Sequence, residues 1–416
     1  MERNRLQVEL ERMRESADEE VIDLSDTSFH ANGMRFPDQE LRELFEDYLR
    51  NRAYSPEPKG ALPARTAVSE YYERQGISIP SDRIIVTAST SEAYGLLFSS
   101  LADAGDNVVL PRPTYPLFEY LAEYSRLEPR YYEMRFEDSF RIDPERVREQ
   151  IDGDTSFVVL ISPNNPTGRV ADSDEVASLL RVCEATGTML ISDEVFSEMA
   201  YPGFGRIAGQ PVARPAGLTS TVPVFTLNGI SKMFASPDLK LGWIAVSGDP
   251  IAVAEPLDRL EVANDTFLSC TSLTQHILPG LFAKGQGLMS EMNETLLENR
   301  DLLLSSLGAG SPASSGMPTG PLVGTSGLRV AAPTGGIHAV IGVPRGTKRG
   351  WSDDESFAVE LLRSRGVYLH PGYFYGMEER SEEIYVVVSF LKRRALLEEG
   401  LARLVSFASG EPGRVG

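Results

Sequence analysis

The sequence predicts an α/β protein: a mostly parallel, seven-stranded sheet sandwiched by helices, with a smaller α/β domain towards the C-terminal end. Three observations predict this fold. Short apolar runs alternate with amphipathic segments between Arg83 and Gly248, as in successive strand and helix units. A similar alternation returns after Ile337. The chain has 416 residues, which suits one large domain and a smaller one.

An N-terminal region precedes the alternating pattern. We expect a charged helix from Arg3 to about Glu20 and a loop from Asp23 to Pro37. A further helix is expected from Asp38 to Arg50. A turn-rich bridge from Tyr54 to Gly60 then leads into a helix from Pro63 to Gln75.

The alternating region supplies the strands and helices of the large domain. Its candidate strands are Ile84 to Ala88, Asn107 to Pro111, Arg130 to Met134, Ser156 to Ser162, Met189 to Asp193, Val224 to Leu227 and Trp243 to Val246. Its helices are expected at Glu92 to Leu101, Leu117 to Tyr124, Asp174 to Glu184 and Pro250 to Val262. Ligands of such sheets bind beyond the carboxyl ends of the strands.

The last part of the chain begins as helix and then alternates again. Helices are expected at Ser272 to Phe282 and at Ser290 to Leu307, the second linking the two domains, and Gly308 to Gly336 is rich in turn-forming residues and reads as a loop. The segments expected to form the small domain are Ile337 to Val343, Glu355 to Arg365, Val367 to His370, Ile384 to Phe390 and Leu396 to Phe407. We expect residues 1–50 to form an arm and part of the small domain, 51–289 the large domain and 290–416 the rest of the small domain.

Composition excludes several classes of partner. The formal net charge of −20 argues against nucleic acid, whose phosphates are bound by clustered Lys and Arg. No long apolar run is present, and the charged start of the chain lacks the apolar core of a secretion signal, so we expect a cytoplasmic protein without a membrane span. Cys183 and Cys270 lie far apart without metal-ligand spacing and read as packing residues.

Lys232 is the most reactive candidate in the sequence. One apolar run, Val222 to Leu227, carries the chain out into the loop that holds Ser231 and Lys232, and another, Leu241 to Val246, returns it to the interior. A lysine placed there is poorly solvated, which favours its neutral, nucleophilic amine. A solvated loop lysine is the alternative at this point.

Four other groups of polar or aromatic residues also follow predicted strands. Thr90 and Ser91 open a helix, whose free amides suit a phosphate, although a simple helix cap would look the same. Tyr115 lies between two prolines that fix the direction of its ring. Asn165 begins an Asn-Pro-Thr-Gly turn. Asp193 ends a buried strand, where a carboxylate is costly to desolvate unless it is paired.

Taken together, these segments resemble the fold-type-I pyridoxal-phosphate aminotransferases of class I and II, the aspartate aminotransferase superfamily. The resemblance spans roughly residues 20 to 405 and is closest to an atypical bacterial subgroup. The segments that carry it, in order, are Thr87-Ala88-Ser89-Thr90-Ser91-Glu92, Pro113-Thr114-Tyr115-Pro116, Pro163-Asn164-Asn165-Pro166-Thr167-Gly168, Asp193-Glu194-Val195-Phe196 and Ser231-Lys232.

The resemblance implies a role for each of these residues towards pyridoxal 5'-phosphate. Lys232 would form the Schiff base with the cofactor and then carry protons, while Asp193 would pair with the pyridine nitrogen. Asn165 would bind the phenolic oxygen and a substrate carboxylate. The remaining cofactor-binding residues would be Thr90, Ser91, Tyr115, Phe196, Ser231, Lys240 and, from the neighbouring subunit of a homodimer, Tyr54. A tyrosine stacked beside prolines is the alternative for Tyr54.

Some positions depart from the family's pattern. Phe196 replaces a tyrosine, Gly229 replaces a phosphate-binding serine, and Lys240 replaces an arginine, which keeps the charge but loses the bidentate fork. These three replacements indicate retuned cofactor binding.

A fourth departure concerns the substrate. Val387 falls where an arginine would clamp the substrate carboxylate. Either another cation, Arg35 first or Lys392 second, reaches that group, or the substrate lacks it. We also expect His370 and Tyr373 in the substrate pocket, with simple packing as the alternative.

The function expected from the resemblance is amino transfer between an amino acid or amine and a 2-oxo acid. A lyase, cyclase or decarboxylase that uses the same cofactor stays open, since no motif separates these reactions. A cofactor-sensing regulatory domain is disfavoured, because the residues before Asp23 are too few and too acidic for a helix-turn-helix.

Overall fold

The structure is a computed structural model that describes residues 4–15, 21–202, 212–268, 270–310, 319–345, 351–378 and 382–410. Its largest sheet has seven strands in the order β2-β8-β7-β6-β5-β3-β4. Their bounds are β2 Ile84–Thr87, β3 Asn107–Arg112, β4 Glu128–Glu133, β5 Thr155–Ile161, β6 Met189–Asp193, β7 Val224–Gly229 and β8 Gly242–Ser247. Only β8 runs antiparallel to its neighbours. The predicted seven-stranded, mostly parallel sheet is confirmed.

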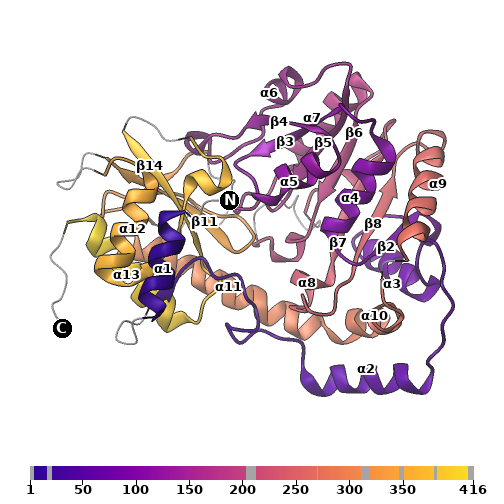
Figure 1. Ribbon diagram of the computed structural model, residues 1–416, viewed down its shortest axis with the longest axis horizontal. Coiled ribbons are helices and arrows are strands. Elements are labelled where there is room, and N and C mark those ends of the chain that lie inside the picture. Colours follow the sequence, from indigo (N-terminus) through magenta and orange to yellow (C-terminus); the bar gives the residue numbers. More distant parts are fainter. Residues whose placement is uncertain are drawn as a thin grey trace.

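Helices cover both faces of this sheet because its strands are apolar on both sides (Figure 1). In β5, Phe157 and Val159 face α4 (Thr90–Leu101), α5 (Leu117–Tyr124) and α9 (Pro250–Phe267). The alternate residues Val158 and Leu160 belong to the cluster that includes α6 (Pro144–Glu149) and α7 (Ser173–Thr186). The sheet therefore forms the middle layer of three.

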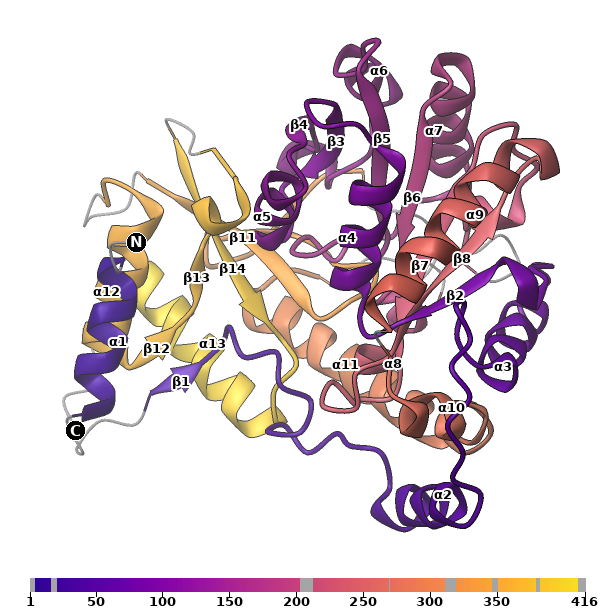
Figure 2. The same ribbon diagram turned by 45° about the vertical axis from the view of Figure 1, so that its right-hand side comes forward.

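The largest apolar cluster continues from the large sheet into the C-terminal part of the chain. It joins α3 (Leu62–Glu73), α10 (Ser272–Lys284) and the long α11 (Gln286–Ser306), which passes from one part to the other (Figure 1). The helix α2 (Asp38–Arg50) packs against α10 but has no buried residue, and it stands away from the rest of the molecule in Figure 2.

A second sheet has five strands in the order β13-β14-β11-β10-β9, all antiparallel. Their bounds are β9 Leu322–Val323, β10 Arg329–Ala331, β11 His338–Pro344, β13 His370–Pro371 and β14 Glu383–Ser389. The helices of this part are α1 (Arg5–Glu15), α12 (Asp354–Arg365) and α13 (Arg394–Ala408), which lie together in Figure 2. A small parallel sheet joins β1 (Ile22–Asp23) to β12 (Val367–Tyr368).

The structure corrects some details of the predicted elements. The segment from Gly308 to Gly336, predicted as loop, includes β9 and β10 in its described part, because two- and three-residue strands leave no readable period in the sequence. The first predicted helix, Arg3 to about Glu20, corresponds to α1 (Arg5–Glu15), and Arg3 and residues 16–20 lie outside the described residues. The domain boundaries stay a prediction, and the one between 289 and 290 falls inside α11.

The carboxyl ends of the parallel strands β5, β6 and β7 meet at one edge of the large sheet. Asn165, Asp193 and Lys232 all follow one of these ends or form it. No described helix has both the length and the apolar character needed to cross a bilayer.

Candidate active site

A cavity of about 440 Å³ lies at this edge of the sheet. It collects most of the residues that the sequence predicts for the site, namely Thr90, Ser91, Tyr115, Asn165, Asp193, Phe196, Ser231, Lys232, Lys240 and His370. These residues come from segments spread over most of the chain, and the fold brings them to one place. The predicted site residues Arg35, Tyr54 and Tyr373 do not line this cavity.

Lys232 lies in α8 (Ile230–Met233), a single helical turn that directly follows β7. Its Nζ lies 5.6 Å from the centre of the Phe29 ring and 5.8 Å from that of Phe196. Within the described part of the chain, no carboxylate forms an ion pair with it. Burial lowers the pKa of Lys232 from its usual range, which favours the neutral amine. The lysine can therefore act as a nucleophile and as a proton acceptor.

The N-terminus of α4 offers free amides to the same cavity. Ser89 caps the helix by accepting a hydrogen bond from the amide of Glu92 at 3.1 Å, and the Glu92 carboxylate accepts one from the amide of Ala88 at 2.6 Å. The amides of Thr90 and Ser91 have no acceptor among the described residues. Such an end, with both amides and the helix dipole directed at it, suits a phosphate dianion.

Two glycines allow neighbouring backbone segments to pack closely behind the N-terminus of α4. A Cβ atom at Gly242 would lie 2.9 Å from the carbonyl carbon of Ser89 and 3.0 Å from the amide nitrogen of Thr90. A Cβ atom at Gly229 would lie 2.7 Å from the carbonyl oxygen of Leu241. The serine that the family's pattern places at 229 would therefore collide with backbone in this chain.

Asp193 is the buried acid of the site. Its Oδ2 accepts a hydrogen bond from the hydroxyl of Tyr94 at 3.1 Å, and its Oδ1 accepts one from the amide of Val195 at 3.2 Å. Burial raises the pKa of Asp193 to about 6, although both hydrogen bonds oppose the shift. No cation in the described part of the chain pairs with it. A protonated ring nitrogen would supply the missing charge.

Asn165 presents an unsatisfied polar atom to the cavity: its Oδ1 is buried and has no hydrogen-bond partner in the described structure. The turn that carries it is fixed from within, because Asn164 Oδ1 accepts hydrogen bonds from the amide and the hydroxyl of Thr167, at 3.2 and 2.9 Å. An orphaned amide oxygen on a rigid turn is suited to a ligand that donates a hydrogen bond.

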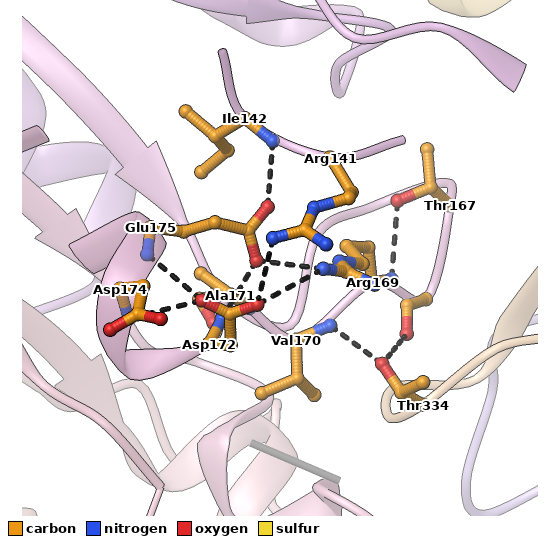
Figure 3. A network of polar contacts seen from close by, with 12 residues as sticks. Arg141, Ile142, Thr167, Arg169, Val170, Ala171, Asp172, Asp174, Glu175 and Thr334 are labelled. Carbon is orange, nitrogen blue, oxygen red and sulfur yellow. Dashed lines mark hydrogen bonds and ion pairs between the residues drawn. The ribbon is translucent and has the colours of Figure 1, made fainter. Parts of the chain in front are cut away.

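A buried ion pair anchors the far end of this turn (Figure 3). The Nη2 of Arg169 lies 2.7 Å from Oε2 of Glu175, and both side chains are almost fully buried. Glu175 also accepts hydrogen bonds from the amides of Ile142 at 2.7 Å and Asp172 at 2.9 Å. Its carboxylate therefore ties the stretch from Arg169 to Glu175 to the separate segment at Ile142.

The same turn is bound to the C-terminal part of the chain through Gly168. Its carbonyl accepts hydrogen bonds from the amides of Thr334 and Gly335 at 2.8 and 2.9 Å, and the Thr334 hydroxyl accepts one from the amide of Val170 at 2.8 Å (Figure 3). Gly168 has a φ of +66°, and a Cβ atom there would lie 2.7 Å from the carbonyl oxygen of His338. Only glycine fits both its conformation and its surroundings.

The remaining predicted residues lie elsewhere. Arg35 is exposed and lies 3.6 Å from the Asp38 carboxylate. Tyr373 is half-exposed, with its hydroxyl 3.4 Å from Glu355. Tyr54, 76% exposed, borders a second cavity of about 570 Å³ between α2, α10 and the segment before α3. Within a single chain, Arg35 and Tyr373 therefore lie outside this cavity, next to nearby acids, and their predicted roles in the substrate pocket stay predictions.

Tyr94, His338 and Tyr375 are among the cavity-lining residues that could not be predicted from the sequence. Tyr94 lies within α4, where an aromatic residue reads as core. His338 follows the Gly-rich segment that was predicted as a loop without a site. The close approach of Gly168 to Gly335 and His338 could not be read from a single sequence.

The residues present fit pyridoxal phosphate. The free amides of α4 match its phosphate, and the unpaired Asp193 matches its ring nitrogen. Lys232 and the unsatisfied Oδ1 of Asn165 line the same cavity. Fold and site together define a pyridoxal-phosphate enzyme.

Comparison with known proteins agrees with this definition. The sequence profile of the family "Aminotransferase class I and II" matches residues 21–389. The S-alkyl-thiohydroximate lyase SUR1 of Arabidopsis thaliana is 28% identical over 378 residues, which cover 89% of this chain and 76% of that protein. A tyrosine aminotransferase of Dictyostelium discoideum is 26% identical over 77% of this chain and 74% of its own length.

Solved structures share the fold. An alanine aminotransferase from Pyrococcus furiosus superposes with a TM-score of 0.83 at 23% identity, over 98% of this chain and 96% of its own. The chain belongs to the class I and II aminotransferases, whose members use pyridoxal 5'-phosphate, and it is an aminotransferase of that kind.

Replacing the buried carboxylate of Asp193 should weaken cofactor binding. We expect Asp193→Asn to weaken cofactor binding by about 10²- to 10⁴-fold, since losing one partner of a buried ion pair costs about 3–5 kcal/mol. Cofactor release measured by equilibrium dialysis checks this. An unchanged dissociation constant would contradict the pairing, and Tyr94→Phe, which keeps the carboxylate, should have a much smaller effect.

The cofactor-free protein should show the raised pKa of Asp193 as a pH dependence of stability. Between about pH 4 and 6 the folded protein keeps a proton that the unfolded chain has lost, so the free energy of unfolding should fall as pH rises. Asp193→Asn should remove this slope, and the variant should be at least as stable as the parent at pH 7. Urea unfolding at several pH values, compared between the two proteins, measures the difference.

The anchoring ion pair should matter for folding. We expect Glu175→Gln to lower the free energy of unfolding by about 3 kcal/mol, because it leaves the Arg169 guanidinium buried without its nearest carboxylate. Urea denaturation of the cofactor-free protein measures the loss. The exposed Glu149→Gln is the matched control and should change the free energy of unfolding by less than about 0.5 kcal/mol. Equal effects of the two substitutions would rule out the anchoring role.

Proposed function

We propose that this enzyme moves an amino group from a small amino acid or amine to a 2-oxo acid, with Lys232 at the centre of the reaction. The observation that carries the proposal is the state of this lysine, which is poorly solvated, without a carboxylate partner among the described residues, and in one cavity with Asp193 and the N-terminus of α4. A structural lysine would be paired or exposed.

Each site residue has a definite task under this proposal. The amides of Thr90 and Ser91, with Ser231 and Lys240, hold the phosphate, and Tyr115 stacks on the ring. Asp193 holds the ring nitrogen in its protonated form. When bound, pyridoxal phosphate supplies a carbonyl that captures the amine and an electron-poor ring that stabilises charge on the substrate carbon.

The chain's own groups carry the protons. Lys232 Nζ, whose pKa is lowered by burial so that the neutral amine is favoured, takes a proton from the substrate carbon and returns it later in the amino transfer. Phe29 and Phe196 keep water away from this amine. Phe196 lines the cavity without a hydroxyl, so the Asn165 side chain is left to bind the phenolic oxygen of the cofactor.

The relatives bear on the choice of reaction. The tyrosine aminotransferases of Dictyostelium and of Mus musculus are named for amino-acid donors, whereas SUR1 is named as a lyase. Both chemistries use a lysine that moves protons, so Lys232 alone does not separate them. Amino transfer leaves the amino group on the cofactor, and a lyase does not.

We also propose that the enzyme is a homodimer with shared sites. The support is Tyr54, which is largely exposed and does not line its own active-site cavity, beside the α2 helix that has no buried residue. In a dimer this tyrosine would contact the cofactor phosphate of the neighbouring subunit. The cytoplasmic location expected from the sequence stays a prediction.

A visible absorption titration tests the proposed function. We expect the cofactor-loaded protein to convert to the amine form when an L-amino acid is added and to return when a 2-oxo acid follows. Lys232→Ala should bind the cofactor but lose the conversion by at least about 10³-fold, since general acid–base and covalent catalysis are both removed. Release of ammonia without conversion would replace the transferase assignment with a lyase.

A further inference from the structure

A 2-oxo acid carries a carboxylate, and a carboxylate entering this cavity needs a partner. The inference that follows rests on the proposed function. In the described part of the chain, the only lysine or arginine side chains that line the cavity are those of Lys232 and Lys240. Both are assigned to the cofactor, so no permanent cation is left for the substrate.

The cations suggested by the sequence do not fill this gap. Arg35 is exposed beside Asp38. The Nζ of Lys392 lies 2.7 Å from Oδ2 of Asp26, which also accepts a hydrogen bond from Asn32 at 2.9 Å. Lys392 is thus already neutralised outside the cavity. Val387 itself is 1% exposed, within an apolar cluster.

Two imidazoles occupy the face of the second sheet that turns to the cavity. His370 of β13 is paired with Val387 of β14, and His338 of β11 is paired with Ser389 of β14. Val387 and Ser389 are two residues apart, so their side chains, and those of the residues opposite them, point to the same face. Both histidines line the cavity, on either side of the strand that carries Val387.

His338 is a buried polar side chain that lacks a partner. It is 5% exposed, and its ring forms no hydrogen bond within the described residues. Burial lowers its pKa to about 3. A neutral imidazole that borders a cavity and has no protein partner is available to a ligand.

His370 has one ring nitrogen fixed and the other free. Its Nδ1 lies 3.0 Å from the hydroxyl of Tyr375, and no partner is described for Nε2. The groups that face the ring are Asp23 of β1, Tyr368 of β12, Tyr375, and His338 across the sheet. Burial lowers the pKa of His370, and Asp23 opposes this shift in part. The ring is therefore neutral at pH 7 but close to a carboxylate that favours its protonation.

We propose that His370, assisted by His338, recognises the substrate carboxylate in place of an arginine. His370 takes up a proton when the carboxylate binds and donates through Nε2, while Tyr375 holds Nδ1. His338 stays neutral and contributes a hydrogen bond. The substrate carboxylate is thus recognised by a pair of imidazoles, one of which becomes charged only when the carboxylate binds.

Proton uptake distinguishes this site from a permanent cation. A bound carboxylate raises the pKa of His370, so at pH values above the pKa of the free enzyme each binding event should take up about one proton. The affinity for carboxylates should therefore fall as pH rises. A guanidinium, charged throughout this range, would take up no proton of its own, so any uptake would then be independent of His370.

The test uses the cofactor-loaded protein and a carboxylic acid without an amino or oxo group, such as 3-phenylpropionate. Calorimetric titration in two buffers of different ionisation enthalpy gives both the dissociation constant and the number of protons taken up. We expect His370→Gln, which keeps a donor near Nε2 but cannot become charged, to abolish proton uptake and weaken binding about tenfold to a hundredfold. His338→Gln should weaken binding less and leave the uptake in place.

Two further variants make the result specific. His370→Arg should restore binding while removing its pH dependence, which a purely structural role of His370 would not allow. His276→Asn, at an imidazole paired with Asp47 outside the cavity, is the control and should match the parent. The proposal is overturned if the parent takes up no proton, or if His370→Gln binds the acid as the parent does.

The outcome separates this inference from the proposed function. The calorimetric titration needs no turnover. If no amino donor converts the cofactor to its amine form, the proposed function alone fails. If L-amino acids convert the cofactor but neither histidine substitution changes carboxylate binding, this inference alone fails.

Discussion

The contact between Gly168 and the segment Thr334 to Gly336 is the constraint on which the site depends. The Gly168 carbonyl accepts two amide hydrogen bonds from the other half of the chain, and its lack of a side chain allows the His338 carbonyl to approach. This contact fixes Asn165 of the large sheet relative to His338 of the second sheet. A cavity with walls from two sheets keeps its shape only if the sheets are joined close to it.

Within that frame, removal from water sets the chemistry of each charged group. The same burial lowers the pKa of Lys232, raises that of Asp193 and keeps His338 neutral. None of these three groups is paired with an opposite charge among the described residues. The site is therefore poised for a ligand that brings a cationic ring nitrogen, an electrophilic carbon and an anion, and burial alone accounts for that selectivity.

Much of the fold and of the candidate site could be predicted from the sequence, because the signals lie within single short segments. The seven strands of the large sheet are apolar runs bounded by turns, so their periodicity identified them, and Lys232, Asp193 and Asn165 follow strand ends at which any parallel sheet collects its ligands. Tyr94 and His338 could not be predicted as site residues because their roles arise from tertiary contacts. The role predicted for Arg35 stays a prediction, because charge can be read from sequence, whereas the direction of an exposed side chain cannot.

The helix α2 has a consequence for the dynamics of the chain. It packs against the core only through partly buried side chains, so in an isolated subunit less free energy opposes its local unfolding than opposes that of the buried strands. Its backbone amides should then exchange hydrogen for deuterium well before those of β5 or β6, whose side chains are buried on both faces of the sheet. Slow exchange in α2 would mean that a second chain covers it, so this helix reports assembly without any measurement of mass.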